Sequence, residues 1–426
     1  MVLDSIMGSG KSTYVIKMMN DAWVDDMGHT LRDPSFTPRR FLVVAPYLTE
    51  VERYGDACSN LRFKEPKPKG GSKVNHLVEL VDAGENIVTT HVLFKMLTKE
   101  ISEKLKKQKY MLVIDEALDC VEIYDKVSLK DKELLFATGM VTRGPNNRLV
   151  WNGETHAKYK GRFDDVKRLC EIGSLVSLDG KTWFLEFPSD FLRCFSEVLI
   201  CTYLFPGSMF DSYLRKEGFS VSLVTLDGDR MVPWCPNADR HARQAYRQLI
   251  RVYVGSMNKI GDEEPMCHPF SAGWLGKMAE KDAKHIRSST QAFFERHAKT
   301  KSKLNGWTTL KDHRGKLSGK GYARGFIPCN AKGTNEYVHK ASLAYLCNMY
   351  LNPVLEQYFA SNGVPVDEDL YALSSMIQWV WRSRIRNGEA IDLYIPSERM
   401  RGLLKDWLDG SVATRLHTSP PLLKAA

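Results

Sequence analysis

A lysine flanked by glycines and hydroxyl side chains lies near the start of the chain, in the stretch Ser5-Ile-Met-Gly-Ser-Gly-Lys-Ser-Thr13. Glycines let backbone N–H groups approach a phosphate closely, and the N-terminus of a following helix adds a favourable partial charge. Ser5 stands where the phosphate-loop pattern has its first glycine. The apolar pair before it and the amphipathic segment after it nevertheless give the strand–loop–helix order that the motif requires. We therefore predict a phosphate-binding loop that holds a nucleotide through Gly8, Ser9, Gly10, Lys11, Ser12 and Thr13.

Two adjacent carboxylates follow an aliphatic run roughly a hundred residues later, where Tyr110-Met-Leu-Val-Ile114 leads into Asp115-Glu116. At the end of a parallel strand, both side chains would face the sheet edge that carries the phosphate loop. Asp115 and the Ser12 hydroxyl would bind Mg²⁺, while Glu116 would orient or deprotonate an attacking water. Lys11 would reach the β- and γ-phosphates. These residues predict an ATP-hydrolysing site with ATP and Mg²⁺ as its cofactors.

A third set of chemically active residues lies near the carboxyl end. Gln378, Arg382 and Arg386 are spaced at i, i+4 and i+8, which predicts one face of a single helix. Arginines brought to a γ-phosphate stabilise the charge that develops during its transfer. We predict catalytic roles for all three residues, with Arg384 as an alternative to Arg386 for the second arginine.

The formal charge of +9 is concentrated in one segment. Thirteen Lys/Arg against four Asp/Glu between Lys277 and Arg324 give +9 there, so the rest of the chain is close to neutral. Such a segment is typical of proteins that bind a polyphosphate backbone, and a solvated helix face with a loop is the alternative. We expect a nucleic-acid partner, with single-stranded or partly duplex DNA favoured.

Cysteine usage and hydropathy bear on where the protein works. The nine cysteines include no C-x-x-C pair, which favours reduced thiols in a cytosolic compartment. No apolar run of 18 residues occurs, and the start lacks the pattern of a secretory signal. We expect a soluble, cytoplasmic protein without membrane contact (in the host cytoplasm if it is viral), compatible with a monomer.

The elements that must position these residues alternate between short apolar runs and helical segments. Runs at 41–46, 86–91, 110–116, 196–205 and 221–226 predict buried parallel strands, and a hairpin is expected around 179–181. A Pro/Asp/Asn-rich stretch at 227–242 separates a second alternation, with strands at 250–254, 305–310 and 326–329 and helices around 343–351 and 373–388. We predict two α/β domains, at 1–230 and 231–426.

The ordered set of motifs resembles superfamily 2 helicases and translocases, especially the compact helicase-like proteins of bacteriophages, over nearly the whole chain. The matching stretches are Gly8 to Ser12, Ala45 to Tyr47, Thr89 to His91, the DExx box Asp115 to Leu118, Cys201 to Tyr203, Trp307 to Thr309, Asn330 to Asn335 and Gln378 to Arg386.

The resemblance implies two tandem RecA-like (P-loop NTPase) domains with an ATP cleft between them. It also implies that nucleic-acid phosphates are gripped by Thr90, Thr334, Lys316 and Lys320. Three departures affect what can be carried over. The Ser/Thr-Ala-Thr triplet of the family is altered at Cys201 to Tyr203, Ile385 stands where the last motif has arginine, and the glutamine motif that reads adenine has no room upstream of the loop.

We therefore expect an ATP-dependent helicase or translocase that moves along or unwinds DNA, less readily RNA, in viral replication or recombination. Two alternatives stay open. A DNA-packaging terminase would need a metal nuclease with three or more acidic residues, whereas residues 250–426 offer Gln378 and arginines. A nucleotide-gated nucleic-acid-binding protein would keep the fold without the unwinding activity.

Overall fold

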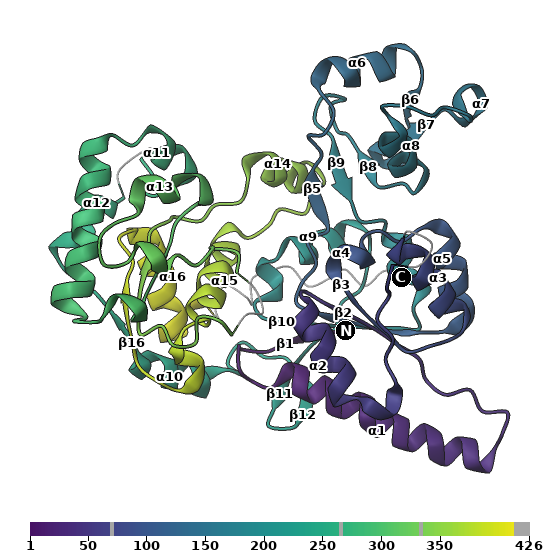
Figure 1. Ribbon diagram of the computed structural model, residues 1–426, viewed down its shortest axis with the longest axis horizontal. Helices are drawn as coiled ribbons and strands as arrows, with labels where there is room; N and C mark the ends of the chain where they lie inside the picture. The colour runs from purple at the N-terminus through teal and green to yellow at the C-terminus, as the bar shows by residue number, and fades with distance from the viewer. Residues whose placement is uncertain (69–71, 264–266, 332–334, 413–426) are drawn as a thin grey trace.

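The chain forms two lobes, each built on its own sheet of largely parallel strands (Figure 1). This computed structural model describes residues 1–68, 72–263, 267–331 and 335–412. We name residues 1–239 the N-terminal lobe and residues 240–412 the C-terminal lobe. In the described part of the chain, no helix combines the length and the apolar composition needed to span a bilayer.

The sheet of the N-terminal lobe has seven strands in the order β12-β11-β1-β10-β4-β2-β3, with β12 antiparallel to β11 and the other pairs parallel. The strands are β1 (Val2–Asp4), β2 (Phe41–Ala45), β3 (Ile87–Thr90), β4 (Met111–Asp115), β10 (Glu197–Thr202), β11 (Leu223–Asp227) and β12 (Arg230–Pro233). Every residue of β1 and β2 is buried, because helices cover both faces of the sheet. This explains why these strands read as continuous apolar runs.

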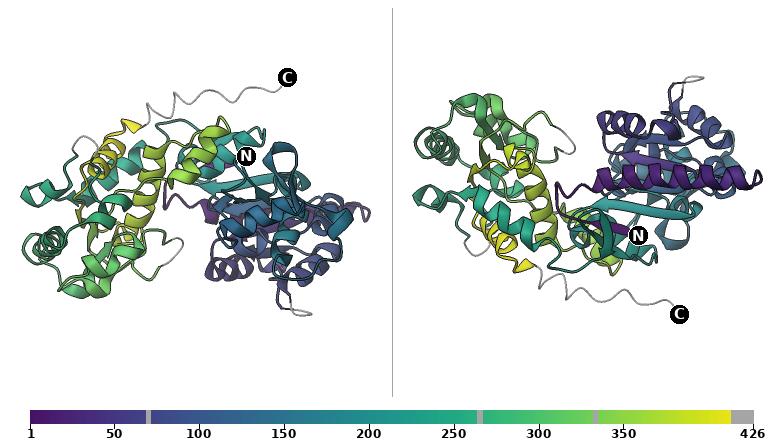
Figure 2. Two further views of the ribbon diagram at one scale, coloured as in Figure 1. Left: turned by 90° about the horizontal axis from the view of Figure 1, so that it is seen from above. Right: turned by 90° about the horizontal axis from the view of Figure 1, so that it is seen from below.

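Helices divide between the two faces. α1 (Lys11–Arg32) and α2 (Leu48–Ala57) share one hydrophobic cluster. The other face is covered by α3 (Lys73–Asp82), α4 (His91–Phe94), α5 (Lys99–Gln108) and α9 (Met209–Lys216). Seen from below, α1 runs along the N-terminal lobe away from the C-terminal lobe (Figure 2).

A small unit with its own hydrophobic cluster is inserted between β4 and β10 and stands above the sheet in Figure 1. It contains β5 (Val121–Ile123), α6 (Leu129–Ala137), β6 (Val141–Arg143), β7 (Leu149–Trp151), α7 (Gly153–His156), α8 (Asp164–Glu171), β8 (Leu175–Val176) and β9 (Phe184–Glu186). The predicted hairpin around 179–181 is confirmed, because β8 and β9 pair antiparallel on either side of it.

The sheet of the C-terminal lobe is parallel throughout, in the order β13-β16-β15-β14. Its strands are β13 (Ile250–Val252), β14 (Asn305–Thr308), β15 (Ser342–Tyr345) and β16 (Ile391–Tyr394). Its helices are α10 (Arg240–Leu249), α11 (Ala272–Lys277), α12 (Glu280–Ala292), α13 (Arg314–Leu317), α14 (Pro353–Ser361), α15 (Glu368–Val380) and α16 (Glu398–Asp409). The predicted class, α/β with two tandem RecA-like domains, is confirmed.

Two predicted elements around β15 are wrong. Residues 326–329 form no strand, and Phe326 makes only an isolated bridge to Trp307. The strand lies instead at β15, within a stretch predicted to be helical. All four residues of β15 are buried, and a short fully buried run has no periodicity that separates strand from helix.

One helix of the C-terminal lobe belongs to the core of the N-terminal lobe. α14 lies beside β5, between the two lobes (Figure 1). Its Tyr358 and Phe359 are fully buried in the cluster formed by α3, α5 and α9. The rings of Tyr358 and Phe184 lie 4.6 Å apart. The chain therefore crosses back to the first lobe before it completes the second.

Candidate nucleotide-binding site

The predicted phosphate loop joins β1 directly to α1. Gly8 and Gly10 have φ values of 77° and 86°, a left-handed backbone that glycine adopts without steric cost. Gly10 is the N-cap of α1, so the helix begins at Lys11. Ser5, at the position where glycine was expected, anchors the loop to the neighbouring strand. Its hydroxyl lies 2.8 Å from Thr225 Oγ1 and accepts the Leu226 N–H of β11 at 3.0 Å.

Polar side chains at the end of the loop form hydrogen bonds with the loop backbone and with the end of β4. Lys11 Nζ donates to the carbonyl oxygens of Ser5 and Ile6, at 2.6 Å and 3.2 Å. Ser12 Oγ donates to Asp115 Oδ2 at 3.3 Å. Ser9 Oγ is buried and has no hydrogen-bond partner among the described residues. The predicted nucleotide loop and the predicted metal carboxylate therefore lie side by side.

The end of β4 presents Asp115 in a buried, hydrogen-bonded position. Tyr54 of α2 donates its O–H to Asp115 Oδ2 at 3.0 Å, and the His91 ring contacts the Asp115 carbonyl at 2.8 Å. Burial raises the pKa of Asp115 to about 6, and the nearby Glu116 carboxylate adds to the rise while the Tyr54 hydrogen bond opposes it. A cation here would favour the ionised carboxylate. Because Mg²⁺ prefers oxygen ligands, the Ser12 hydroxyl and the Asp115 carboxylate fit it.

Glu116 has a backbone conformation that is uncommon for its residue type. Its φ is 68°, in the left-handed region that non-glycine residues rarely occupy. The Glu116 N–H donates to the Cys201 carbonyl of β10 at 2.8 Å, which holds this turn in place. The Glu116 side chain lines the cleft beside Asp115. Strained backbone of this kind concentrates at functional sites.

The C-terminal lobe brings Gln378, Arg382 and Arg386 to the same cleft, but not on one helix face. The predicted helix over 373–388 is confirmed only as far as Val380, where α15 ends. Ser383 is extended, donates its O–H to the Val380 carbonyl at 2.7 Å and accepts the Ile385 N–H at 3.5 Å. A serine hydroxyl that bonds nearby backbone in this way competes with helix continuation. A separate 3₁₀ turn follows at Arg384–Asn387.

The arginines of this segment differ in their surroundings. Arg382 is buried, which lowers its pKa, while the Glu116 carboxylate opposes that shift. Arg382 Nε donates to the Ala331 carbonyl at 3.2 Å, and Arg386 donates to the Asn335 side chain. Arg384 instead donates to the Ala390 carbonyl at 2.6 Å and does not line the cleft. The sequence left open whether Arg384 or Arg386 is the second arginine of the site. Of these two, Arg386 lines the cleft.

The cleft between the lobes holds about 290 Å³ of water-accessible space and is open to solvent. It is lined by Met7, Gly8, Gly10, Lys11, Ser12, Thr13, Pro46, Glu50, Arg53, Asp115, Glu116, Asn335, Gln378, Trp381, Arg382 and Arg386. Sequence reasoning missed Arg53, Tyr54 and Trp381. Trp381 lies between Gln378 and Arg382, which was a usable signal, whereas nothing in the pattern of α2 indicated that Tyr54 lies under the end of β4.

Of the residues predicted to bind nucleic acid, the three that the structure describes do not line the cleft. Thr90 caps α4, where its hydroxyl accepts the Leu93 N–H at 3.4 Å. Lys316 and Lys320 are exposed on and after α13, which packs against α12 in the C-terminal lobe. Thr334 lies outside the described residues.

The fold is that of an α/β protein with two RecA-like lobes, and charged residues from both lobes line one cleft. The chain belongs to the YonV family. It is 38% identical over 421 residues to the SPbeta prophage-derived protein YonV of Bacillus subtilis (strain 168), covering 96% of this chain and 98% of the relative.

Family models match two parts of the chain. Residues 121–184, the inserted unit, match the YonV middle domain, and residues 244–408 match the YonV C-terminal Rossmann-like domain. Among solved structures, S. tokodaii Xpd4 is 12% identical, with a TM-score of 0.45 over 95% of this chain and 93% of that chain.

Proposed function

We propose that this protein is a nucleic-acid-stimulated ATPase that moves along or unwinds DNA. The observation that carries the proposal is the cleft, in which the phosphate loop and Asp115-Glu116 of one lobe face Arg382 and Arg386 of the other. Residues from two lobes that meet at one nucleotide make hydrolysis and lobe movement interdependent. The prophage origin of the YonV relative supports a role in viral replication or recombination.

Each residue has a defined task in this proposal. The bound MgATP supplies the phosphoanhydride and the charge-neutralising cation. Lys11, which donates to the Ser5 and Ile6 carbonyls, would contact the phosphates instead, and Ser12 and Asp115 would hold Mg²⁺. Glu116 positions the water and accepts its proton.

The C-terminal lobe supplies the remaining charge. Arg382 and Arg386 stabilise negative charge on the transferred group, an effect on the order of 10³–10⁵ in rate where arginine fingers are known. Gln378 lines the same cleft and would contact the phosphates. Thr90, Thr334, Lys316 and Lys320 bind the phosphates of the nucleic-acid strand, so that lobe movement is converted into displacement along it.

The test is the ATPase rate with and without single-stranded and duplex DNA and RNA. We expect hydrolysis to rise when nucleic acid is added, with DNA more effective than RNA. Glu116→Gln removes the proton acceptor and should lower the rate on the order of 10²–10⁴-fold while nucleotide binding persists.

Glu171→Gln, an exposed change at the end of α8, is the matched control and should keep the wild-type rate. If nucleic acid does not change the ATPase rate of the wild-type protein, the proposal that the protein moves along DNA is contradicted. Nucleotide-dependent nucleic-acid binding without hydrolysis would instead support the nucleotide-gated binding protein.

A further inference from the structure

Two aromatic side chains of the C-terminal lobe contact the phosphate loop directly. Tyr246 of α10 donates its O–H to the Met7 carbonyl at 3.0 Å. The Trp381 indole covers Gly8 so closely that a Cβ built on Gly8 would lie 2.4 Å from Trp381 Cζ2. Met7 also lines a small apolar pocket whose other walls, Leu404 among them, belong to the C-terminal lobe. The Met7–Gly8 segment is therefore held from outside its own lobe.

The two aromatic residues are themselves fixed by packing. Their ring centroids lie 5.1 Å apart at an interplanar angle of 67°, an edge-to-face arrangement of the kind that aromatic pairs prefer. Tyr246 also stacks on Trp407 of α16, at 6.2 Å and 16°. Neither Tyr246 nor Trp381 can turn away from the loop without disturbing this packing.

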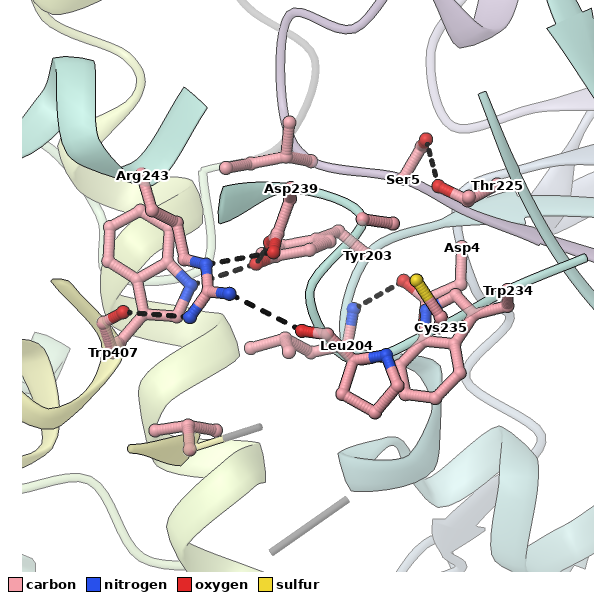
Figure 3. Close-up of a pocket in the computed structure, with 14 residues that line it drawn as sticks. Asp4, Ser5, Tyr203, Leu204, Thr225, Trp234, Cys235, Asp239, Arg243 and Trp407 are labelled. Carbon is pink, nitrogen blue, oxygen red and sulfur yellow. Dashed lines mark hydrogen bonds and ion pairs between the residues drawn. The ribbon is translucent and has the colours of Figure 1, made fainter. Parts of the chain in front are cut away.

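A polar network connects this aromatic cluster to the sheet of the N-terminal lobe (Figure 3). Trp407 Nε1 donates to the Tyr203 hydroxyl at 2.8 Å, and Tyr203 donates to Asp239. Asp239 forms an ion pair with Arg243 at 2.8 Å, and Arg243 donates to the Trp407 carbonyl at 3.3 Å. Tyr203 directly follows β10, the strand between the phosphate-loop strand and the Asp115 strand.

Trp381 also immediately precedes Arg382, which lines the nucleotide cleft. The contact between Trp381 and Gly8 therefore links the loop to the residue next to Arg382. Gly8 is required here, because a side chain at this position would collide with the indole.

We propose that Tyr246 and Trp381 are positioning residues that hold the phosphate loop, and the arginine facing it, in register from the second lobe. The proposal rests on the function proposed above and adds its regulation. A rotation of the lobes breaks the Tyr246–Met7 hydrogen bond and removes the indole from Gly8. The affinity for a nucleoside triphosphate therefore depends on how the two lobes are oriented. Because such coupling is reciprocal, a bound nucleotide shifts the equilibrium between lobe orientations by the same free energy.

The test measures backbone amide hydrogen exchange at residues 6–10 and the affinity for a fluorescent MgATP analogue. Tyr246→Phe removes only the hydroxyl, and Trp381→Phe shrinks the ring over Gly8. We expect both variants to speed exchange in the loop several-fold. Nucleotide affinity should fall roughly 3–10-fold in Tyr246→Phe, the range expected for one net hydrogen bond, and should also fall in Trp381→Phe.

Matched controls lie in the same lobe. Tyr394→Phe deletes a hydroxyl that donates to the Met257 carbonyl at 2.7 Å, and Trp274→Phe shrinks a ring that stacks on Phe270. Both controls should leave loop exchange and nucleotide affinity at wild-type values while shifting the unfolding midpoint at least as much as the test variants do.

Unchanged loop exchange in both test variants would overturn the proposal, and so would faster exchange with unchanged nucleotide affinity. If the wild-type protein binds no nucleotide, the proposed function fails. Hydrogen exchange needs no nucleotide. It would then still test whether Tyr246 and Trp381 hold the loop in place.

Discussion

Asp4 is a buried carboxylate at the residue where β1 passes into the phosphate loop. Its two oxygens accept the N–H groups of Leu204 (Figure 3) and Phe205, at 2.9 Å and 3.1 Å, which ties the loop to the segment after β10. Burial raises the pKa of Asp4 to about 7, while the two N–H groups and the charge of Lys11 oppose the rise. At this position the fold prefers a protonated acid.

This preference predicts a pH dependence of stability. Between about pH 4 and pH 7 the folded chain keeps a proton on Asp4 that the unfolded chain releases. The associated stability is present at low pH and is lost as the pH rises through 7. Asp4→Asn cannot titrate. The free energy of unfolding of the wild type should therefore fall relative to this variant between pH 4 and pH 8, on the order of a few kcal/mol.

Urea denaturation at each pH measures this difference. Asp56→Asn, an exposed change on α2, is the control and should follow the wild-type curve. Parallel pH curves for wild type and Asp4→Asn would show that Asp4 is ionised in the fold.

At the scale of elements, α14 couples the two lobes more firmly than its position in the chain suggests. Tyr358 donates to the Glu186 carboxylate, which is 1% exposed and also forms an ion pair with Lys216 at 2.8 Å. Phe359 completes the cluster around α3, α5 and α9. A helix of the second half thus supplies part of the hydrophobic core of the first.

Phe359→Ala should lower the free energy of unfolding by about 3–5 kcal/mol, the usual cost of an unfilled aromatic site in a core. The control on the same helix is Val354→Ala, where the side chain is 37% exposed and the expected change is within about 0.5 kcal/mol. Chemical denaturation followed by circular dichroism distinguishes the two. Equal effects would show that α14 does not stabilise the first lobe.

The parts of the site that could be predicted from sequence are those carried by local patterns. The loop from Gly8 to Ser12 and the Asp115-Glu116 pair follow buried strands, and strand ends meet at one sheet edge whatever the rest of the chain does. Gln378 and Arg382 were identified as residues of the cleft but placed on a helix that is too long, because Ser383 stops it through a side-chain bond that periodicity does not reveal. Tyr54 had no local signature at all, since its contact with Asp115 arises only from tertiary packing.

The whole molecule carries its basic charge on one lobe. The segment from Lys277 to Arg324 includes α12, the buried strand β14 and α13, and Lys316 and Lys320 are exposed there. The positive surface is therefore displaced from the nucleotide cleft and belongs to the lobe that supplies Arg382. A strand bound there would move with that lobe.

Neutralising this surface should weaken nucleic-acid binding by removing phosphate contacts. The double variant Lys316→Gln, Lys320→Gln should lower affinity for single-stranded DNA and reduce the slope of log affinity against log salt by about 1–2, because each lost contact removes about 0.7. Fluorescence anisotropy across a salt series measures both quantities. Lys17→Gln with Lys106→Gln, exposed lysines of α1 and α5, is the control, and an equal loss there would indicate attraction by net charge alone.

The return of α14 to the first lobe also has a consequence for how the protein is made. When β12 leaves the ribosome, every strand of the first sheet has been synthesised, but Tyr358 and Phe359 have not. At about 5–20 residues per second, translation reaches them on the order of ten seconds later. During that interval the nascent first lobe exposes the apolar surface that α14 will cover, so this is the period in which a chaperone would have most to bind.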